Sequence, residues 1–200
     1  MIIAAIISLI LGALCGQYIF TPKTVEFFAA ISDKALMLLM FSVGIGVGEN
    51  KLLFRKMQEY NIRIIVIPIG TVLGSLLGGA LCSFALGMPL RESLCISSGL
   101  GWYSLSGVLL TELSGADIGT IAFLSNVMRE IMAFILVPVL AKFLNGYSAI
   151  APAGATSCDT SLSVIAKYTN EEVTMMAVIN GVICTAAIPV LINTIFTLFS

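Results

Sequence analysis

The chain has no histidine, few charged residues and no run of basic residues. Without histidine, carboxylates are the side chains that can exchange protons near neutral pH, and only where burial raises their pKa. With a net charge of −1 and no basic patch, nothing suggests a nucleic-acid partner. The sequence also lacks a phosphate-binding loop, zinc-ligand spacing and hydrolase nucleophile motifs. We therefore expect neither an enzyme, nor a metal site, nor a cofactor.

What the chain has in abundance is apolar sequence. Hydrophobic residues make up 58% of it and charged residues 10%, against roughly 25% charged residues in a soluble domain. The mean hydropathy is +1.06. The five cysteines are scattered through apolar segments without ligand spacing, which favours small packing residues over disulfides or metal ligands. The composition predicts a membrane protein.

Apolar runs of about 20 residues predict five spanning helices, at 2–20, 28–48, 62–86, 117–143 and 173–199. Two further segments, 93–112 and 150–168, are interrupted by small and polar residues, and we expect them to be broken helices that line a cavity. Residues 1–20 lack a basic region and a cleavage site, so they are predicted to remain as a helix. The fold class is thus an all-α polytopic membrane protein with one transmembrane domain, residues 1–200. It has about seven membrane elements, two of them discontinuous or re-entrant.

The two interrupted segments resemble each other. Each is followed by a polar turn and a long helix that carries an asparagine, and Asn126 and Asn180 are 54 positions apart. Asp117 and Glu171 have the same separation. Few residues are identical, so an internal repeat and a chance likeness both remain open.

Basic residues indicate the orientation. The loop 50–63 holds four of the ten, Lys51, Arg55, Lys56 and Arg63, which predicts a cytoplasmic loop. Threading seven elements from this loop places the N-terminus inside and the C-terminus outside, and both broken segments then enter from the outer side.

The helix 117–143 carries charge in its middle. Asn126, Arg129 and Glu130 share a small, polar face with Ala122 and Ala133. A charged side chain at the centre of a spanning helix costs about 2.5–3.5 kcal/mol on insertion scales, so such residues mark substrate or ion paths. One interpretation is that Arg129 or Glu130 binds a charged end of a substrate while Asn126 supplies a hydrogen bond. The alternative is that neighbouring helices neutralise both charges and the pair fixes the packing.

The second broken segment offers Asp159. An aspartate after Ser157 and Cys158 is an ordinary N-cap for a short helix, yet near mid-membrane it could also take a cation or a proton. In that case the N–H groups of Ala155 to Ser157 could face a substrate carboxylate.

The first broken segment offers further candidates. Trp102 is either an interfacial aromatic or part of a gate or cavity wall, and Ser104 is a candidate cavity hydroxyl. Glu112, at a helix end, is a second-rank candidate for ion coupling. Asn180 joins the candidates through its correspondence with Asn126.

Two ridges of small residues allow close helix packing in lipid. Their members are Ser8, Gly12 and Gly16, and Gly70, Gly74, Gly78 and Cys82.

Three motifs, GLGWYSLSGVLLTE (99–112), NVMREI (126–131) and GATSCD (154–159), resemble the LysO-type lysine exporters of bacterial inner membranes. The resemblance implies export of L-lysine and lysine analogues. It also implies membrane-embedded acidic residues, of which one matches Asp159. The other falls at Asn126, so either Glu130 takes its role one turn later or substrate and coupling differ. Typical members have further helices before the matched region, which implies a homodimer or a small hydrophobic companion subunit.

The sequence thus favours a secondary active exporter of lysine or a similar cationic amino acid in a bacterial cytoplasmic membrane, coupled to protons or another ion. The rival hypothesis is a non-transporting scaffold or assembly subunit whose buried charges bind a partner; a channel is a third.

Overall fold

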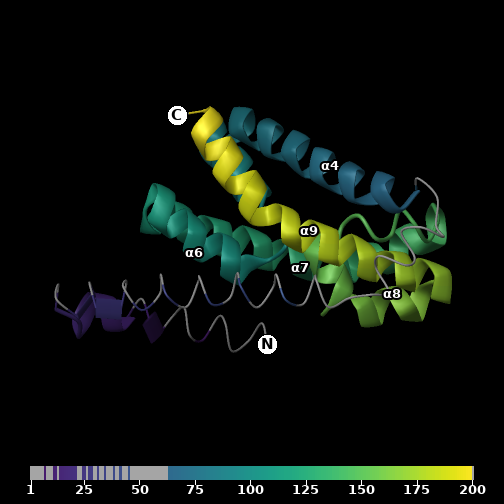
Figure 1. Ribbon diagram of the computed structural model, residues 1–200, viewed down its shortest axis with the longest axis horizontal. Helices are drawn as coiled ribbons and strands as arrows, with labels where there is room; N and C mark the ends of the chain where they lie inside the picture. Colours follow the sequence, from purple (N-terminus) through teal and green to yellow (C-terminus); the bar gives the residue numbers. More distant parts are fainter. Residues whose placement is uncertain are drawn as a thin grey trace. The chain divides into compact units, whose positions relative to one another are not determined.

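The computed structural model describes residues 63–199 without interruption and a smaller set of positions before them (Figure 1). The earlier positions are 7, 11–12, 14–21, 24–25, 27–28, 31, 34, 38, 41 and 45. The chain divides into two compact units, Met1–Ile45 and Gly46–Ser200, and each is described by itself. Most of the predicted span 28–48, about half of the predicted span 2–20, and Ser8 of the first small-residue ridge lie outside the described residues.

In the first unit, described residues are helical up to Tyr18 and again from Thr24. The hydroxyls of Thr21 and Thr24 lie 2.7 Å apart at the turn between them. The rings of Phe20 and Phe28 stack with their centroids 5.1 Å apart.

The second unit is built from helices. They are α4 (Arg63–Leu86), α5 (Leu90–Ser97), α6 (Tyr103–Ser114), α7 (Ala116–Phe143), the 3₁₀ helix η1 (Gly154–Cys158), α8 (Leu162–Tyr168) and α9 (Glu171–Leu198). Three of these, α4 from Ile65, α7 and α9, are long and apolar enough to cross a membrane. The described part of the chain contains no strand, which confirms the prediction of an all-helical fold.

The predicted segment 93–112 is two helices, α5 and α6, on either side of a break at residues 98–102. We call residues 90–114 the first broken segment and residues 98–102 its tip. At its outer end Arg91 lies over the ring of Phe196, near the end of α9. The tip reaches the middle of α7, and α6 then runs back along α7, so that Tyr103 contacts Phe123 and the chain turns at Gly115. Both arms therefore lie at the same end of the bundle.

The second broken segment, residues 145–168, approaches from the other end. Its start is fixed to the beginning of α9, where the Tyr147 hydroxyl donates to Glu172 over 2.6 Å. Its tip, residues 153–158, reaches the middle of α9, where Ser157 donates to the carbonyl of Ala177 over 2.8 Å. From the tip, α8 returns to the end where α9 begins.

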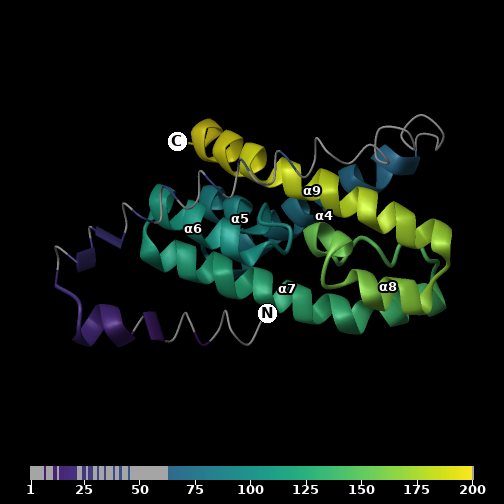
Figure 2. The same ribbon diagram turned by 60° about the horizontal axis from the view of Figure 1, so that its bottom comes forward.

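The two broken segments thus enter the bundle from opposite ends. Both views show α6 at the end where the chain finishes and α8 at the end where α9 begins (Figures 1 and 2). The prediction that both segments enter from one side is wrong. Sequence threading assumed that each segment continues in one direction through its break, whereas the chain reverses there.

Unusual backbone conformations produce both reversals. Leu100 has a φ of 47° and Gly101 a φ of 97° at the first tip, and Gly154 has a φ of 57° at the second. This left-handed region is open to glycine and strained for a bulky residue such as leucine. The tips meet, because the N–H of Ala155 donates to the carbonyl of Leu100 over 2.9 Å.

The main core lies between α7, the second broken segment and α9. Its fully buried members include Val137, Ile150 and Ile165. By contrast, α4 exposes Leu77, Leu81 and other apolar side chains along one face, as a lipid-facing helix does.

Candidate functional site

Asn126 braces the first tip. Its Oδ1 accepts a hydrogen bond from the N–H of Gly101 over 2.7 Å. Its Nδ2 donates to the Ile96 carbonyl, the Ser106 hydroxyl and the Ala122 carbonyl at 2.9–3.2 Å. The side chain is only 3% exposed. Both donors of the amide are used within the protein, and the side chain holds together the backbone that the break leaves without helical partners.

Asn180 does the same at the second tip. Its Nδ2 donates to the Gly154 carbonyl over 3.1 Å and to the Ser157 hydroxyl over 3.0 Å. The Ser157 hydroxyl is itself buried and donates to carbonyls of the tip and of α9. The N–H of Ala155 donates to the Leu100 carbonyl and that of Thr156 to the Ala153 carbonyl. The sequence suggested that these N–H groups could face a substrate carboxylate, but in the structure both are already bonded.

Arg129 lies at the midpoint of α7, about 20 Å from either end at 1.5 Å per residue. Its Nε donates to the Pro152 carbonyl over 3.3 Å, next to the second tip. Its Nη1 donates to the Ser75 hydroxyl of α4 over 2.7 Å. Within the described residues no carboxylate forms an ion pair with it.

Glu130 points to a different neighbour. The hydroxyl of Thr160, between the second tip and α8, donates to its Oε1. Its Oε2 is buried and has no hydrogen-bond partner among the described residues, and the side chain is 1% exposed. A buried carboxylate oxygen without a donor is destabilising, so this atom is a place where a cation or a proton would be stabilised.

Asp159 follows η1 directly and is exposed. It is not an N-cap, because Ser161 occupies the cap position of α8, so that interpretation of Asp159 is wrong. The Glu130 carboxylate accepts from Thr160, which directly follows Asp159 in the chain. Glu130 and Asp159 therefore both lie beside the second tip.

The remaining candidates lie along α6. Trp102 is partly buried at the N-cap position, and Ser104 is exposed in the first turn. Glu112 is exposed near the other end of the helix, about 14 Å from Tyr103 at 1.5 Å per residue, and so lies apart from the charged residues at the tips.

Sequence reasoning missed Ser75 and Thr160. The Ser75 hydroxyl accepts a hydrogen bond from Arg129, and the Thr160 hydroxyl donates one to Glu130. Neither residue belongs to a motif that would have pointed to it in the sequence. Ser75 lies next to Gly74 of the glycine ridge of α4, where the sequence pattern predicts only small packing residues. Thr160 could have been noticed as the hydroxyl next to Asp159.

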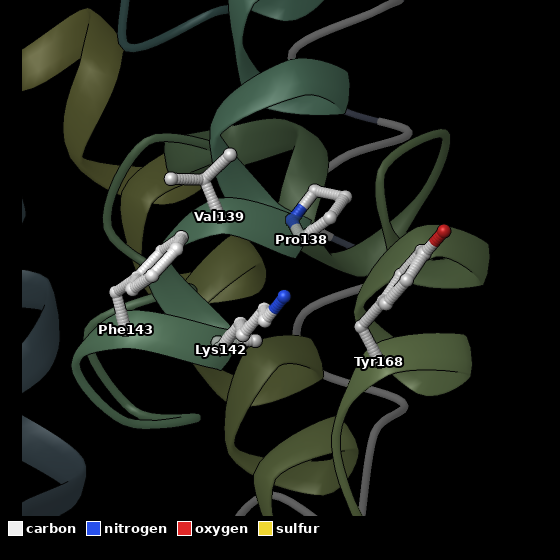
Figure 3. A pocket seen from close by; sticks show the side chains of 6 residues that line it. Pro138, Val139, Lys142, Phe143 and Tyr168 are labelled. Atoms are coloured by element: carbon white, nitrogen blue, oxygen red, sulfur yellow. The ribbon is translucent and has the colours of Figure 1, made fainter.

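A separate pocket of about 450 Å³ opens at the end of α7. Figure 3 shows Lys142 between Phe143 and Tyr168, with Pro138 and Val139 beside them. Its lining contains a lysine and no carboxylate, which does not suit a cationic ligand.

Long apolar helices with two broken segments, whose tips meet beside central charges, define a polytopic membrane protein of the transport class. Residues 6–196 match the family model described as "Lysine exporter LysO", and the chain belongs to this family. It is 36% identical over 161 residues to "Lysine exporter LysO" of Escherichia coli, a match that covers 80% of this chain and 53% of that protein. It is 35% identical over 196 residues to a Haemophilus influenzae protein named "Putative lysine exporter", covering 98% and 96% of the two chains. The chain thus spans about half of the first relative and nearly all of the second. No solved structure matches it.

Proposed function

We propose that this protein is a secondary active transporter that exports L-lysine, lysine analogues or similar cationic amino acids across the cytoplasmic membrane of a bacterium. Family membership and the names of the two relatives support the class of activity. The chemistry of the cluster at the tips supports the class of substrate.

One observation carries the proposal: Arg129 and Glu130 are adjacent at mid-helix, and neither has a counter-charge within hydrogen-bonding range in the described part of the chain. The two side chains do not pair with each other, because Arg129 bonds Ser75 and Glu130 bonds Thr160. With Asp159 included, the ionised cluster carries one positive and two negative charges. Lysine, with one carboxylate and two ammonium groups, has the complementary set, so both ends of the substrate find an opposite charge.

In this proposal the two broken segments are re-entrant. Each brings its tip to mid-membrane from one face. The first broken segment with α7 and the second broken segment with α9 form the two halves of an inverted repeat. Three elements of the described unit, α4, α7 and α9, then cross the bilayer.

The charge distribution supports an orientation. Lys142 and Lys167 lie at the end of the bundle where α4 begins, and Arg91 lies at the other. Four further basic residues, 51–63 in the sequence, precede or start α4. By the positive-inside rule this end is cytoplasmic, and the C-terminus lies outside.

Coupling to a proton or another ion fits the site as well. No nucleotide-binding motif is present in the sequence to power transport. Glu130, with one free oxygen, and exposed Asp159 are the groups that we propose exchange an ammonium group of the substrate for the coupling ion.

For assembly we propose a homodimer or a complex with a small hydrophobic subunit, packed through α4. In the described residues nothing lies within 4 Å of a Cβ built on Gly70, Gly74 or Gly78. A ridge of this kind allows a second helix to approach closely.

Lysine efflux from cells fed a lysine dipeptide tests the proposal. Cells that lack their own lysine exporters and express this chain should release lysine, whereas Glu130→Gln and Asp159→Asn should reduce the release at least tenfold without loss of protein from the membrane. Asp117→Asn, at an exposed position in the first turn of α7, is the matched control and should retain efflux. A protein that leaves efflux unchanged, alone and with its genomic neighbours, would instead support the scaffold hypothesis.

A further inference from the structure

The guanidinium of Arg129 has donors to spare. Arginine has five N–H donors, and the structure uses one of them on the Pro152 carbonyl and one on the Ser75 hydroxyl. The other three, including both on Nη2, have no acceptor among the described residues. Both existing acceptors are neutral, so the positive charge itself is unmatched. Arg129 is partly buried, where an unmatched charge is destabilising, and an anionic ligand would offset this cost.

Arg129 packs against the backbone of both tips. A Cβ built on Gly154 would lie 3.2 Å from Nη2 of Arg129, and one built on Gly101 would lie 3.8 Å from its Cδ. The arginine therefore lies against the glycines of both tips, where the backbone can approach a ligand closely. Helix α6, whose N-cap Trp102 provides no side-chain bond, begins two residues after Gly101.

Ser75 fixes the direction of the guanidinium. Its hydroxyl donates to the Thr71 carbonyl over 2.7 Å, so its proton is used within α4. The lone pairs that remain point away from that bond and accept from Nη1 of Arg129. A hydroxyl with this arrangement holds the arginine fork in one orientation, which is what bidentate recognition of a carboxylate requires.

We infer that Arg129 binds the carboxylate of the exported amino acid and that Ser75 is its positioning residue, so that the pair selects amino acids over amines of the same length. The inference rests on the proposed function and adds to it the group that determines specificity. In this arrangement the carboxylate of the substrate lies at Arg129 and an ammonium group lies at Glu130 and Asp159.

Cadaverine, which is lysine without its carboxylate, is the probe. The full chain is reconstituted in liposomes, and counterflow of labelled lysine is competed with unlabelled lysine or cadaverine. For the wild type the half-inhibitory concentration of cadaverine should exceed that of lysine at least tenfold. Arg129→Gln should bring this ratio close to one, because lysine loses affinity and cadaverine does not.

Ser75 provides the test that remains if Arg129→Gln fails to fold. Ser75→Ala should reduce the cadaverine-to-lysine ratio severalfold, mainly by raising the KM for lysine, whereas Ser75→Thr keeps the hydroxyl and should keep the ratio. Ser83→Ala is the matched control on α4, since that hydroxyl bonds the Met88 carbonyl and not the arginine. Lysine counterflow with the same ratio in the wild type and Ser75→Ala would overturn the inference and leave the proposed function standing. Absence of lysine counterflow in the wild type would overturn both.

Discussion

The N–H of Ala155 donates to the carbonyl of Leu100, and this bond of 2.9 Å joins two segments that enter the bundle from opposite ends. Around it lie the strained Leu100 and the positive-φ Gly154. The contact lies next to Arg129, so any movement of one tip relative to the other changes the surroundings of the central charge. For an alternating-access transporter this is the place where opening toward one face and closing toward the other would meet.

We expect Gly154→Ala to be severely destabilising. Its Cβ would collide with the Leu100 carbonyl oxygen, a backbone atom that cannot turn aside. The positive φ of 57° adds strain of roughly 1–2 kcal/mol. Thermal unfolding in detergent should show a loss clearly larger than this strain alone.

Gly87→Ala is the control for that experiment. Gly87 has a similar φ of 65°, but no atom lies within 4 Å of the added Cβ. The control should therefore lose only the strain contribution. Equal losses in the two variants would show that the contact between the tips is not tight.

Replacing either bracing asparagine should loosen its tip. Asn126→Ala leaves the Gly101 N–H without its acceptor, and Asn180→Ala removes a donor shared by Gly154 and Ser157. Leaving a buried polar group unpaired costs about 1–3 kcal/mol, so each variant should melt several degrees lower. Asn193→Ala, an exposed asparagine of α9 that bonds only the Pro189 carbonyl, should melt like the wild type. A wild-type melting temperature in both bracing variants would argue against this role.

Cysteine labelling from each face of the membrane should separate re-entrant segments from crossing ones. In a background without the five native cysteines, Lys142→Cys and Lys167→Cys should react from the same side, and Asp117→Cys from the other. All three positions are exposed. If the second broken segment crossed the bilayer, Lys142→Cys and Lys167→Cys would react from opposite sides.

The glycine ridge of α4 should be sensitive to bulk. Gly74→Leu with Gly78→Leu should weaken assembly and transport together, because the added side chains would hold a partner helix away. Native mass spectrometry in mild detergent measures the assembly. Leu73→Ala with Leu77→Ala, on exposed neighbouring positions, controls for a general effect on α4. A functional single chain that tolerates the leucines would contradict the proposed assembly.

The sequence predicted the positions of the long helices well, because apolar runs of membrane length have few alternatives. The predicted spans 62–86, 117–143 and 173–199 correspond to α4, α7 and α9 within two residues at each end. It also showed where the chain breaks, since glycines and serines interrupt 93–112 and 150–168. It could not show the reversals, because the direction after a break depends on the φ of single residues such as Leu100 and on the contact between two distant tips.

For the site, the sequence identified the charges but not their surroundings. Arg129, Glu130 and Asp159 stand out because ionised side chains are rare in apolar helices. Asn126 stood out on a polar helix face and Asn180 through its correspondence with Asn126, and both bond the protein's own backbone. An amide on a polar helix face serves a substrate or a neighbouring break equally well, and only the fold decides which. Ser75 and Thr160 became visible through their bonds to the charges.

The bracing amides also impose an order on biogenesis. Asn126 follows the first tip residue that it holds, Gly101, by 25 positions, and Asn180 follows Ser157 by 23. Each tip therefore leaves the ribosome before the side chain that will satisfy its backbone. Helices as short as α5 and α8, of eight and seven residues, are too short to insert into lipid alone. The unit that inserts into the membrane is consequently a broken segment together with the long helix that follows it. A chain that stops before α9 would leave the second tip without the bonds from Asn180.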